Sequence, residues 1–174
     1  MTRDHHAQSP FPRVRPSIRK PGCVFCGILD GTEAASMVYE DDEIAAFMDI
    51  GPFVEGHLLV VPRDHYANFT DMPEELGARL VVIGMRLARA IRASGLPCEG
   101  FGTRLVEGAA AGQEVFHVHL HIYPRYKGDP MDLKLSPLGF AERIRQLRGI
   151  PSREELDSTA ARIRAAYEQA LHTS

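Results

Sequence analysis

Three histidines alternate with apolar residues in the segment His117-Val118-His119-Leu120-His121-Ile122-Tyr123. Because successive side chains of a strand point to opposite faces, the three imidazoles would share one face and the apolar side chains the other. The apolar face would pack against the core, so the imidazoles would line an exposed or cleft-facing row. An imidazole can attack phosphorus at neutral pH and form a phosphoramidate that water then cleaves. The alternatives are a metal site built from several histidines and a chance arrangement at the surface.

A second group with chemical potential is the C-x-x-C formed by Cys23 and Cys26. Three cysteines are too few for a disulfide scaffold, so this pair indicates metal or redox chemistry. A thioredoxin-like redox pair would open a helix directly after a strand, and no strand is predicted before Cys23. A closed zinc site would need two further ligands. Cys98 stands alone and is expected to be a small apolar side chain.

The elements that would position these residues alternate between strands and one long helix. A helix is expected over 76–91, where apolar residues recur at helical spacing, with Asp71 and Glu74 as a capping pair and Pro73 in the first turn. Gly95 and Pro97 would end it. Strands are expected over 37–40, 44–49, 57–61, 101–107 and 115–123.

The C-terminal region is predicted to be helical. A short helix would carry Phe140, Ile144 and Leu147, and a capping box of Ser152 and Glu155 would begin a second one. The resulting fold class is α+β, a mainly antiparallel sheet of about five strands with the long helix packed on it. We expect three parts: a flexible N-terminal extension over 1–20, a domain over 21–127, and a C-terminal helical extension over 128–174.

Composition narrows the function classes. The chain of 174 residues has the length of one ordinary domain, and its net charge is −3. A nucleic-acid binder would normally carry a basic excess, so no nucleic-acid partner is expected, whereas a few local donors could still hold a small anion. No apolar stretch approaches the roughly 18 residues of a membrane span, and no apolar segment follows the basic N-terminus. We therefore expect a cytoplasmic protein without a membrane partner.

The stretch from Cys23 to Tyr126 resembles a histidine-triad (HIT) domain. Four motifs appear in the family's order: C-V-F-C-G-I-L-D-G, V-Y-E-D-D-E-I-A-A-F-M-D-I, G-H-L-L-V-V-P-R-D-H and A-G-Q-E-V-F-H-V-H-L-H-I-Y-P-R. The segment 151–156 is similar to the C-terminal helix of the Fhit-like branch. The resemblance implies a hydrolase that attacks the α-phosphate of a nucleoside 5′-phosphoramidate, a dinucleoside polyphosphate or a related nucleotidyl conjugate. A transferase or phosphorylase and a non-catalytic nucleotide-binding module are the alternatives.

The resemblance also implies roles for the triad. His119 would be the nucleophile and form a nucleotidyl-histidine, with a backbone carbonyl holding its other ring nitrogen. His121 would donate a hydrogen bond to a non-bridging phosphate oxygen. His117, the first triad histidine, would join Cys23, Cys26 and His57 around a structural Zn²⁺. His65 is a weaker alternative as a zinc ligand.

Further residues are implied on the substrate side. Gln113 and the amides of the Gly112 loop would cradle the phosphate, and Asp49 would accept hydrogen bonds from the ribose hydroxyls. The candidates for an apolar base slot, for which a plain core role is an equal alternative, are Phe25, Ile28 and Ile50.

Two residues depart from the motifs of the family. Val106 stands where the family commonly has an amide that contacts phosphate, and Glu114 stands where Ser or Thr is usual near the leaving group. Both changes bear on substrate identity and leave the nucleophile in place. The resemblance further implies a homodimer that uses the helix over 76–91 and a strand edge, although a buried monomer core explains the apolar face of that helix equally well.

Overall fold

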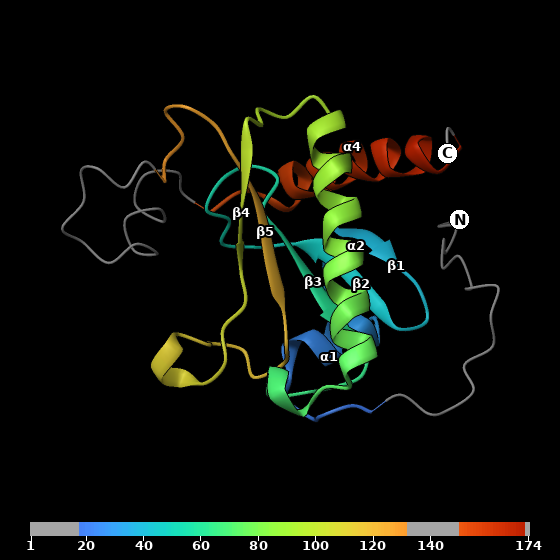
Figure 1. The fold of residues 1–174 in the computed structure, drawn as a ribbon. Coiled ribbons are helices and arrows are strands. Elements are labelled where there is room, and N and C mark those ends of the chain that lie inside the picture. Colours follow the sequence, from blue (N-terminus) through green and yellow to red (C-terminus); the bar gives the residue numbers. More distant parts are fainter. Residues whose placement is uncertain (1–17, 132–149, 173–174) are drawn as a thin grey trace.

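A five-stranded antiparallel sheet in the order β1-β2-β3-β5-β4 organises the chain. It is seen in a computed structural model, which describes residues 18–131 and 150–172 (Figure 1). The sheet confirms the predicted α+β class. The predicted short helix around Phe140, Ile144 and Leu147 lies outside the described residues, as does most of the expected N-terminal extension. The strands are β1 (Met37–Glu40), β2 (Ile44–Met48), β3 (Leu58–Pro62), β4 (Gly100–Arg104) and β5 (Leu120–Arg125).

Strand β5 begins and ends later than predicted. Residues 115–119 follow an irregular path, because the His117 N–H donates to the Val115 carbonyl and the Val118 N–H donates to the Tyr66 carbonyl. The strand then continues through Pro124, which lies past Ile122, the last β5 residue in register with β3. Strand β4, in contrast, ends earlier than predicted, at Arg104 rather than at residue 107.

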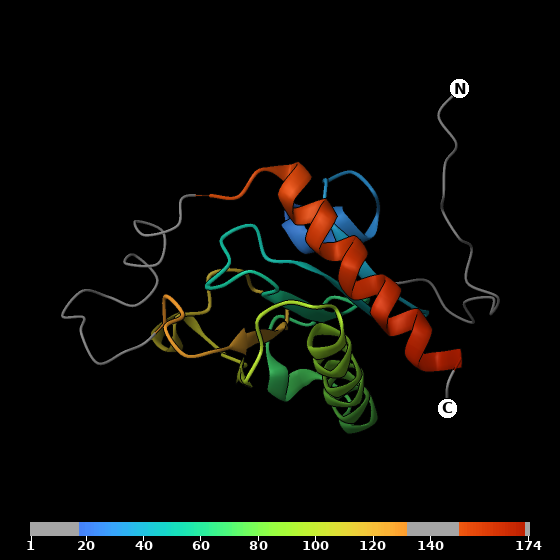
Figure 2. The same cartoon turned by 90° about the horizontal axis from the view of Figure 1, so that it is seen from above.

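Two long helices, α2 (Glu74–Ala93) and α4 (Arg153–His172), cover one face of the sheet. Figure 2 looks nearly along α2, with α4 running across the view. The apolar spacing predicted for α2 places Leu80, Ile83 and Leu87 in the core, where each contributes about 1.5–3 kcal/mol through burial. Gly84 lets α2 approach β5 closely, because a Cβ there would lie 2.7 Å from Ile122 Cδ1.

The starts of the two helices differ from each other. The predicted capping pair of Asp71 and Glu74 is wrong: α2 starts directly after Pro73, without a side-chain capping hydrogen bond, and Asp71 accepts from Asn68 in a 3-10 turn, η1 (Phe69–Asp71). The predicted capping box of α4 is confirmed. The Ser152 N–H donates to Glu155 Oε2 at 2.8 Å, and the Glu155 N–H donates to Ser152 Oγ at 3.2 Å.

The short helix α1 (Val24–Leu29) lies on the opposite face of the sheet. Phe25 and Leu29 pack there against Phe47, Leu59 and Val61. Since odd-numbered residues of β2 and β3 face α1 and even-numbered residues face α2, both faces at the sheet centre are buried. A second short turn, η2 (Ala109–Ala111), follows β4. Within 18–131 and 150–172, no helix has both the length and the apolarity to cross a membrane.

Candidate active site and metal centre

The triad segment runs along the β5 end that lies nearest to α1. Val118 and Ile122 are buried on the α2 side, whereas the imidazoles of His119 and His121 project from the other face. Their ring centroids lie 4.8 Å apart with the planes inclined at 67°. The predicted separation of imidazoles from apolar side chains is therefore present, even though regular strand begins only at Leu120.

The backbone fixes the tautomer of His119. Its Nδ1 lies 2.7 Å from the His117 carbonyl oxygen, and because a carbonyl only accepts, Nδ1 must carry the proton. Nε2 of the neutral ring is then left with a lone pair. This atom has no hydrogen-bond partner among the described residues, and it is not one of the fully buried unpartnered atoms. Burial lowers the pKa of His119, which keeps that lone pair available at neutral pH.

His57 fixes the tautomer of His121 in a similar way. The Phe53 N–H donates to His57 Nδ1 at 3.1 Å, so the neutral His57 ring carries its proton on Nε2. That Nε2 lies 3.0 Å from His121 Nδ1, which must accept. The His121 proton is therefore on Nε2, as a donor. Burial lowers the pKa of both rings to about 3, so both are neutral at pH 7.

Asp49 lies beside this histidine pair. Its Oδ1 accepts from the Gly51 N–H at 2.8 Å, and its Oδ2 lies 3.5 Å from His57 Nδ1 and 3.8 Å from His121 Nδ1. The three side chains could in principle surround a metal ion. However, the direct 3.0 Å contact between the two imidazoles leaves no room for an ion between them. We therefore describe the cluster as a carboxylate beside two hydrogen-bonded imidazoles and not as a metal site.

A separate cluster joins Cys23, Cys26, His65 and His117, whose ligand atoms all lie within 4.8 Å of one another. His117 Nδ1 lies 3.5 Å from Cys23 Sγ and 3.7 Å from Cys26 Sγ, and His65 Nδ1 lies 3.5 Å from Cys26 Sγ. With Zn–S bonds of about 2.3 Å and Zn–N bonds of about 2.0 Å, a tetrahedral site separates sulfur and nitrogen ligands by about 3.5 Å. The donor set and its spacing fit zinc.

The orientation of His117 supports the same conclusion. Its Nε2 lies 2.9 Å from the Pro62 carbonyl oxygen and must donate, which leaves a lone pair on Nδ1 aimed at the two sulfurs. Such a partner on the second ring nitrogen is what a ligating histidine normally has. Both cysteines are free thiols, and Cys23 caps α1 without a preceding strand, unlike a thioredoxin-type pair.

The structure corrects the fourth member of the expected zinc set. His57 does not join the thiols, because its Nδ1 accepts from Phe53 and its Nε2 contacts His121. His65 takes the place because the N-terminal segment runs beside it: the Ile18 N–H donates to Asp64 Oδ1, and the His65 N–H donates to the Ile18 carbonyl. The two histidines flank β3 in sequence, at its opposite ends.

Comparison with known proteins identifies the fold family. The HIT domain family matches residues 31–128, more than half of the chain. The chain belongs to the HIT family. An uncharacterized HIT-like protein of Mycobacterium tuberculosis is 41% identical over 134 residues, which make up 77% of this chain and 92% of that protein. An Arabidopsis thaliana protein named adenylylsulfatase HINT3 is 35% identical over 118 residues, 67% of this chain and 59% of that protein.

Solved structures give the same result. The crystal structure of a zinc-bound histidine triad family protein from Mycobacterium smegmatis matches with a TM-score of 0.72 at 35% identity, covering 88% of this chain and 98% of that one. A HIT-like protein from Bartonella henselae matches with a TM-score of 0.70 at 29% identity, covering 85% of this chain and 98% of the other. The resemblance to the HIT family found in the sequence is thereby confirmed.

In this HIT protein, the loop after β4 is held by its own side chains. The Gln113 amide is buried and fully engaged: it donates to the Ala67 and Val115 carbonyls and accepts from the Gly108 N–H. It therefore shapes the loop and is not free for a phosphate. Gly112 has φ 87°, a conformation that favours glycine, and Glu114 is exposed.

The expected base-slot residues do not form one surface. Phe25 is buried, and its ring meets the His119 ring edge-on with centroids 5.3 Å apart. Ile28 packs on the α1 cluster, and Ile50 is 64% exposed. Phe25 contacts the rings of both His117 and His119, and since it lies between the two cysteines in sequence, it connects the cysteine cluster to His119.

The sequence motifs did not indicate Arg104 as a residue of the site. It lies directly opposite His121 in the β4–β5 register, and its side chain is exposed. Burial is the largest cause of the lowered pKa values of His119 and His121, and the Arg104 charge adds to it in both. The one signal available was its position as the lone basic residue of the predicted strand over 101–107, which precedes the glycine loop.

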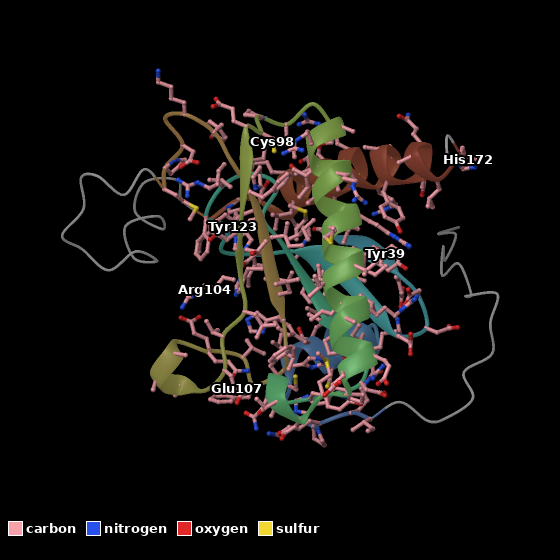
Figure 3. All side chains as sticks on the ribbon, viewed as in Figure 1. Tyr39, Cys98, Arg104, Glu107, Tyr123 and His172 are labelled. Carbon is pink, nitrogen blue, oxygen red and sulfur yellow. The ribbon has the colours of Figure 1, made fainter. Side chains whose placement is uncertain are left out.

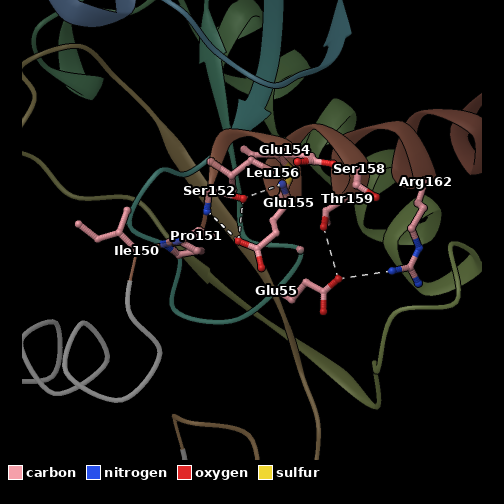
Figure 4. Close-up of a pocket in the computed structure, with 13 residues that line it drawn as sticks. Glu55, Ile150, Pro151, Ser152, Glu154, Glu155, Leu156, Ser158, Thr159 and Arg162 are labelled. Carbon is pink, nitrogen blue, oxygen red and sulfur yellow. Dashed lines mark hydrogen bonds and ion pairs between the residues drawn. The ribbon is translucent and has the colours of Figure 1, made fainter.

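A cavity of about 510 Å³ lies elsewhere, between the loop before β3 and the start of α4 (Figure 4). Glu55 accepts there from Thr159 and Arg162, each at 3.4 Å. None of the triad or metal-cluster residues lines it. Its described polar groups are largely satisfied by one another, so it adds nothing to the chemistry of the site.

Proposed function

We propose that this protein is a nucleotide hydrolase in which His119 Nε2 attacks the α-phosphate of a nucleotidyl substrate. The observation that carries the proposal is the 2.7 Å contact between His119 Nδ1 and the His117 carbonyl oxygen, because it directs the lone pair to Nε2. The N–P bond forms as the bond to the leaving group breaks. Water then cleaves the nucleotidyl-His119 and releases a nucleoside monophosphate.

Two further interactions would support this reaction. The His121 Nε2–H would donate to a non-bridging oxygen, where charge grows in the transition state. The His117 carbonyl would stabilise the positive charge that the His119 ring gains when Nε2 is bonded to phosphorus. Asp49 stands near enough to the imidazole pair to offset that charge, and it is the candidate acceptor for the ribose hydroxyls.

Nucleoside 5′-phosphoramidates, dinucleoside polyphosphates and related nucleotidyl conjugates are the proposed substrate class. Membership of the HIT family supports a nucleotide, and the relative named adenylylsulfatase adds nucleotidyl sulfates to the panel. A transferase or phosphorylase would use the same His119 intermediate with phosphate or another acceptor in place of water. A product assay with and without inorganic phosphate separates these reactions.

The proposal is tested by His119→Asn, with His172→Asn on the exposed end of α4 as the matched control. We expect the first variant to lose turnover by at least about 1000-fold while keeping its melting temperature, and the control to keep both. Acid-quenched wild-type enzyme should carry one nucleotidyl group on His119 by mass spectrometry. Turnover that survives in His119→Asn would refute the mechanism.

A non-catalytic nucleotide-binding module is the second candidate. It is favoured by Val106, which offers no donor to a phosphate, and by the fully engaged amide of Gln113. Calorimetry with AMP, together with a turnover screen of the substrate panel, discriminates the two. Tight binding without turnover of any substrate would establish the module and exclude the hydrolase.

We also propose that Zn²⁺ is bound by Cys23, Cys26, His65 and His117, where it would hold α1 against the sheet. A bound ion would supply charge neutralisation for two thiolates and a rigid cross-link, a structural role. The fit of the donor spacing and the zinc-bound relative support it.

A homodimer is proposed from the outer surface of α2. These side chains are apolar but exposed: Val81 by 48%, Val82 by 43% and Met85 by 53%. The other face of the helix packs in the core. Strand β4 lies at an edge of the sheet, where a strand of a second copy could pair with it. Light scattering should give a dimer for the wild type and for Leu171→Glu, and a monomer for Met85→Glu. A monomeric wild type would rule the dimer out.

A further inference from the structure

The β4 residues that face the triad form an unusual row. The register pairs Gly100 with Arg125, Gly102 with Tyr123, and Arg104 with His121. Directly opposite residues of an antiparallel pair project from the same face. The triad side of β4 therefore carries two glycines and one arginine. Tyr123 covers Gly102, since a Cβ at that glycine would collide with its ring.

Arg104 lies on the side of His121 that is opposite His57. The sheet order places β5 between β3 and β4, so His121 has the Nε2 of His57 on one flank and Arg104 on the other. Figure 3 shows Arg104 near the end of β4, between Tyr123 and Glu107. Because His57 occupies Nδ1 of His121, the proton-bearing Nε2 is the atom left for a ligand. Opposite residues place their Cβ atoms about 5 Å apart, so an anion at that Nε2 is within reach of an arginine side chain on β4.

The Arg104 guanidinium is held through one of its three nitrogens only. Its Nη2 donates to the Ala111 carbonyl at 3.1 Å, which is its single hydrogen bond to the described residues. The same nitrogen would lie 3.1 Å from a Cβ on Gly112, so the glycine gives it room beside the loop. A guanidinium has five N–H donors, and the side chain is exposed, which leaves donors for an anion.

We propose that Arg104 binds the leaving group of the substrate, and that this leaving group is an anion, a sulfate or a phosphate. This inference rests on the proposed function, because the leaving group is defined by attack of His119 on the α-phosphate. The attacking and leaving atoms lie roughly in line across phosphorus. Arg104 is the one charged side chain of β4, and because it lies directly opposite His121 it is placed to meet a group that departs from a phosphate bound there.

The chemistry of arginine selects between leaving groups. When His119 displaces sulfate or a phosphate chain, the P–O electron pair leaves with an anion that needs no proton. An amine displaced from a phosphoramidate must gain a proton, and a guanidinium cannot supply one because it is not deprotonated in proteins. Arg104 would therefore stabilise the departure of sulfate or phosphate through charge-assisted hydrogen bonds and offer nothing to an amine.

The test compares Arg104→Gln with Arg86→Gln, which removes the same charge from the exposed side of α2. The substrates are adenosine 5′-phosphosulfate, diadenosine triphosphate and adenosine 5′-phosphoramidate. We expect Arg104→Gln to lower kcat/KM by about 10- to 100-fold for one or both anionic leaving groups, and by less than about threefold for the phosphoramidate. The two anionic substrates decide between sulfate and phosphate, and Arg86→Gln should change none of the three.

A purely structural role for Arg104, through its bond to Ala111, predicts a different result. Loosening of the loop would lower kcat/KM for all three substrates by similar factors, and that outcome, or no loss for either anionic substrate, would overturn the proposal. Arg104→Lys adds a control, because it keeps the charge and should recover part of the rate with the anionic substrates only.

A binding experiment separates this inference from the proposed function. In the His119→Asn background, calorimetry measures the affinities of adenosine 5′-phosphosulfate and AMP. Adding Arg104→Gln should weaken binding of the phosphosulfate by about tenfold and binding of AMP by less than about threefold. Equal weakening of both would refute the role of Arg104 and leave the proposed mechanism standing. Unchanged turnover in His119→Asn alone would refute the mechanism, and the affinities would still decide the role of Arg104.

Discussion

The two histidine clusters of this protein differ in what their imidazoles contact. In the cluster with Cys23 and Cys26, the Nδ1 atoms of His65 and His117 converge on sulfur. In the other cluster, His57 and His121 contact each other through ring nitrogens, and His119 contacts a backbone carbonyl. The same side chain therefore has the contacts of a metal ligand in one place, and in the other it has a fixed tautomer that suits the proposed roles of acid and nucleophile.

Geometry, rather than residue type, separates the two uses. A backbone group decides the tautomer in each case: the Pro62 carbonyl for His117, the Phe53 amide for His57 and the His117 carbonyl for His119. Once one ring nitrogen is assigned, the other is committed to a role. Four predictions test this division between the clusters.

Metal removal should produce the largest effect on stability. At a free zinc concentration a thousandfold above its Kd, binding stabilises the folded state by about 4 kcal/mol. For a chain of this size, that corresponds to a melting temperature lower by roughly 8–16 °C after chelation. Elemental analysis should find one zinc per wild-type chain, and Cys26→Ser should behave like the chelated protein. Cys98→Ser, the matched control, should keep both zinc and melting temperature.

The zinc content of histidine variants sharpens the same comparison. His65→Asn should lose the metal, and His57→Asn should retain it, because the ring nitrogens of His57 face Phe53, His121 and Asp49 rather than the thiols. The reverse result would restore the ligand set that the sequence suggested.

Substitution of His57 should have a smaller effect, and this effect should be on kcat. An asparagine can accept from the Phe53 amide but does not extend to His121, whereas a glutamine can place an N–H near the position of Nε2. Loss of the donor to His121 should lower kcat by roughly 10- to 100-fold in His57→Asn. His57→Gln should recover most of the rate. Equal rates in the two variants would show that His57 does not orient His121.

The remaining prediction concerns the pH dependence of stability in the metal-free protein. Burial lowers the folded-state pKa of His57 and His121 from 6.5 to about 3, so the unfolded state binds more protons between these values. The free energy of unfolding should therefore fall as the pH drops below 6.5, by up to about 1.4 kcal/mol per pH unit for each histidine. Urea titrations between pH 7.5 and 5 should show a shallower fall in His57→Gln. A pH-independent wild type would contradict the neutral assignment.

Much of the fold could be predicted because the spacing of apolar residues along the sequence reflects which faces of the helices and strands are buried. The spacing of Leu80, Ile83 and Leu87 reflects one covered face of α2, and the alternation in 117–122 reflects the two sides of β5. These patterns are local and therefore visible in the sequence. The family motifs added the triad and the two cysteines in their correct order.

What could not be predicted depends on contacts between distant segments. His57 and His65 flank β3, and only the path of residues 18–26 beside Asp64 decides which end meets the thiols. The place of Arg104 opposite His121 likewise depends on the register between β4 and β5. The predicted cap at Asp71 is wrong for a local reason, because its carboxylate accepts a hydrogen bond from Asn68, three residues earlier.

His117 belongs to both clusters at once. Its ring faces the thiols, while its own carbonyl oxygen holds the proton of His119. In the proposed mechanism, oxidation of Cys23 and Cys26 or removal of the metal would release the His117 ring, and a turn of its peptide unit would then misplace the carbonyl that orients His119. A single residue therefore couples the proposed metal site to the orientation of the proposed nucleophile.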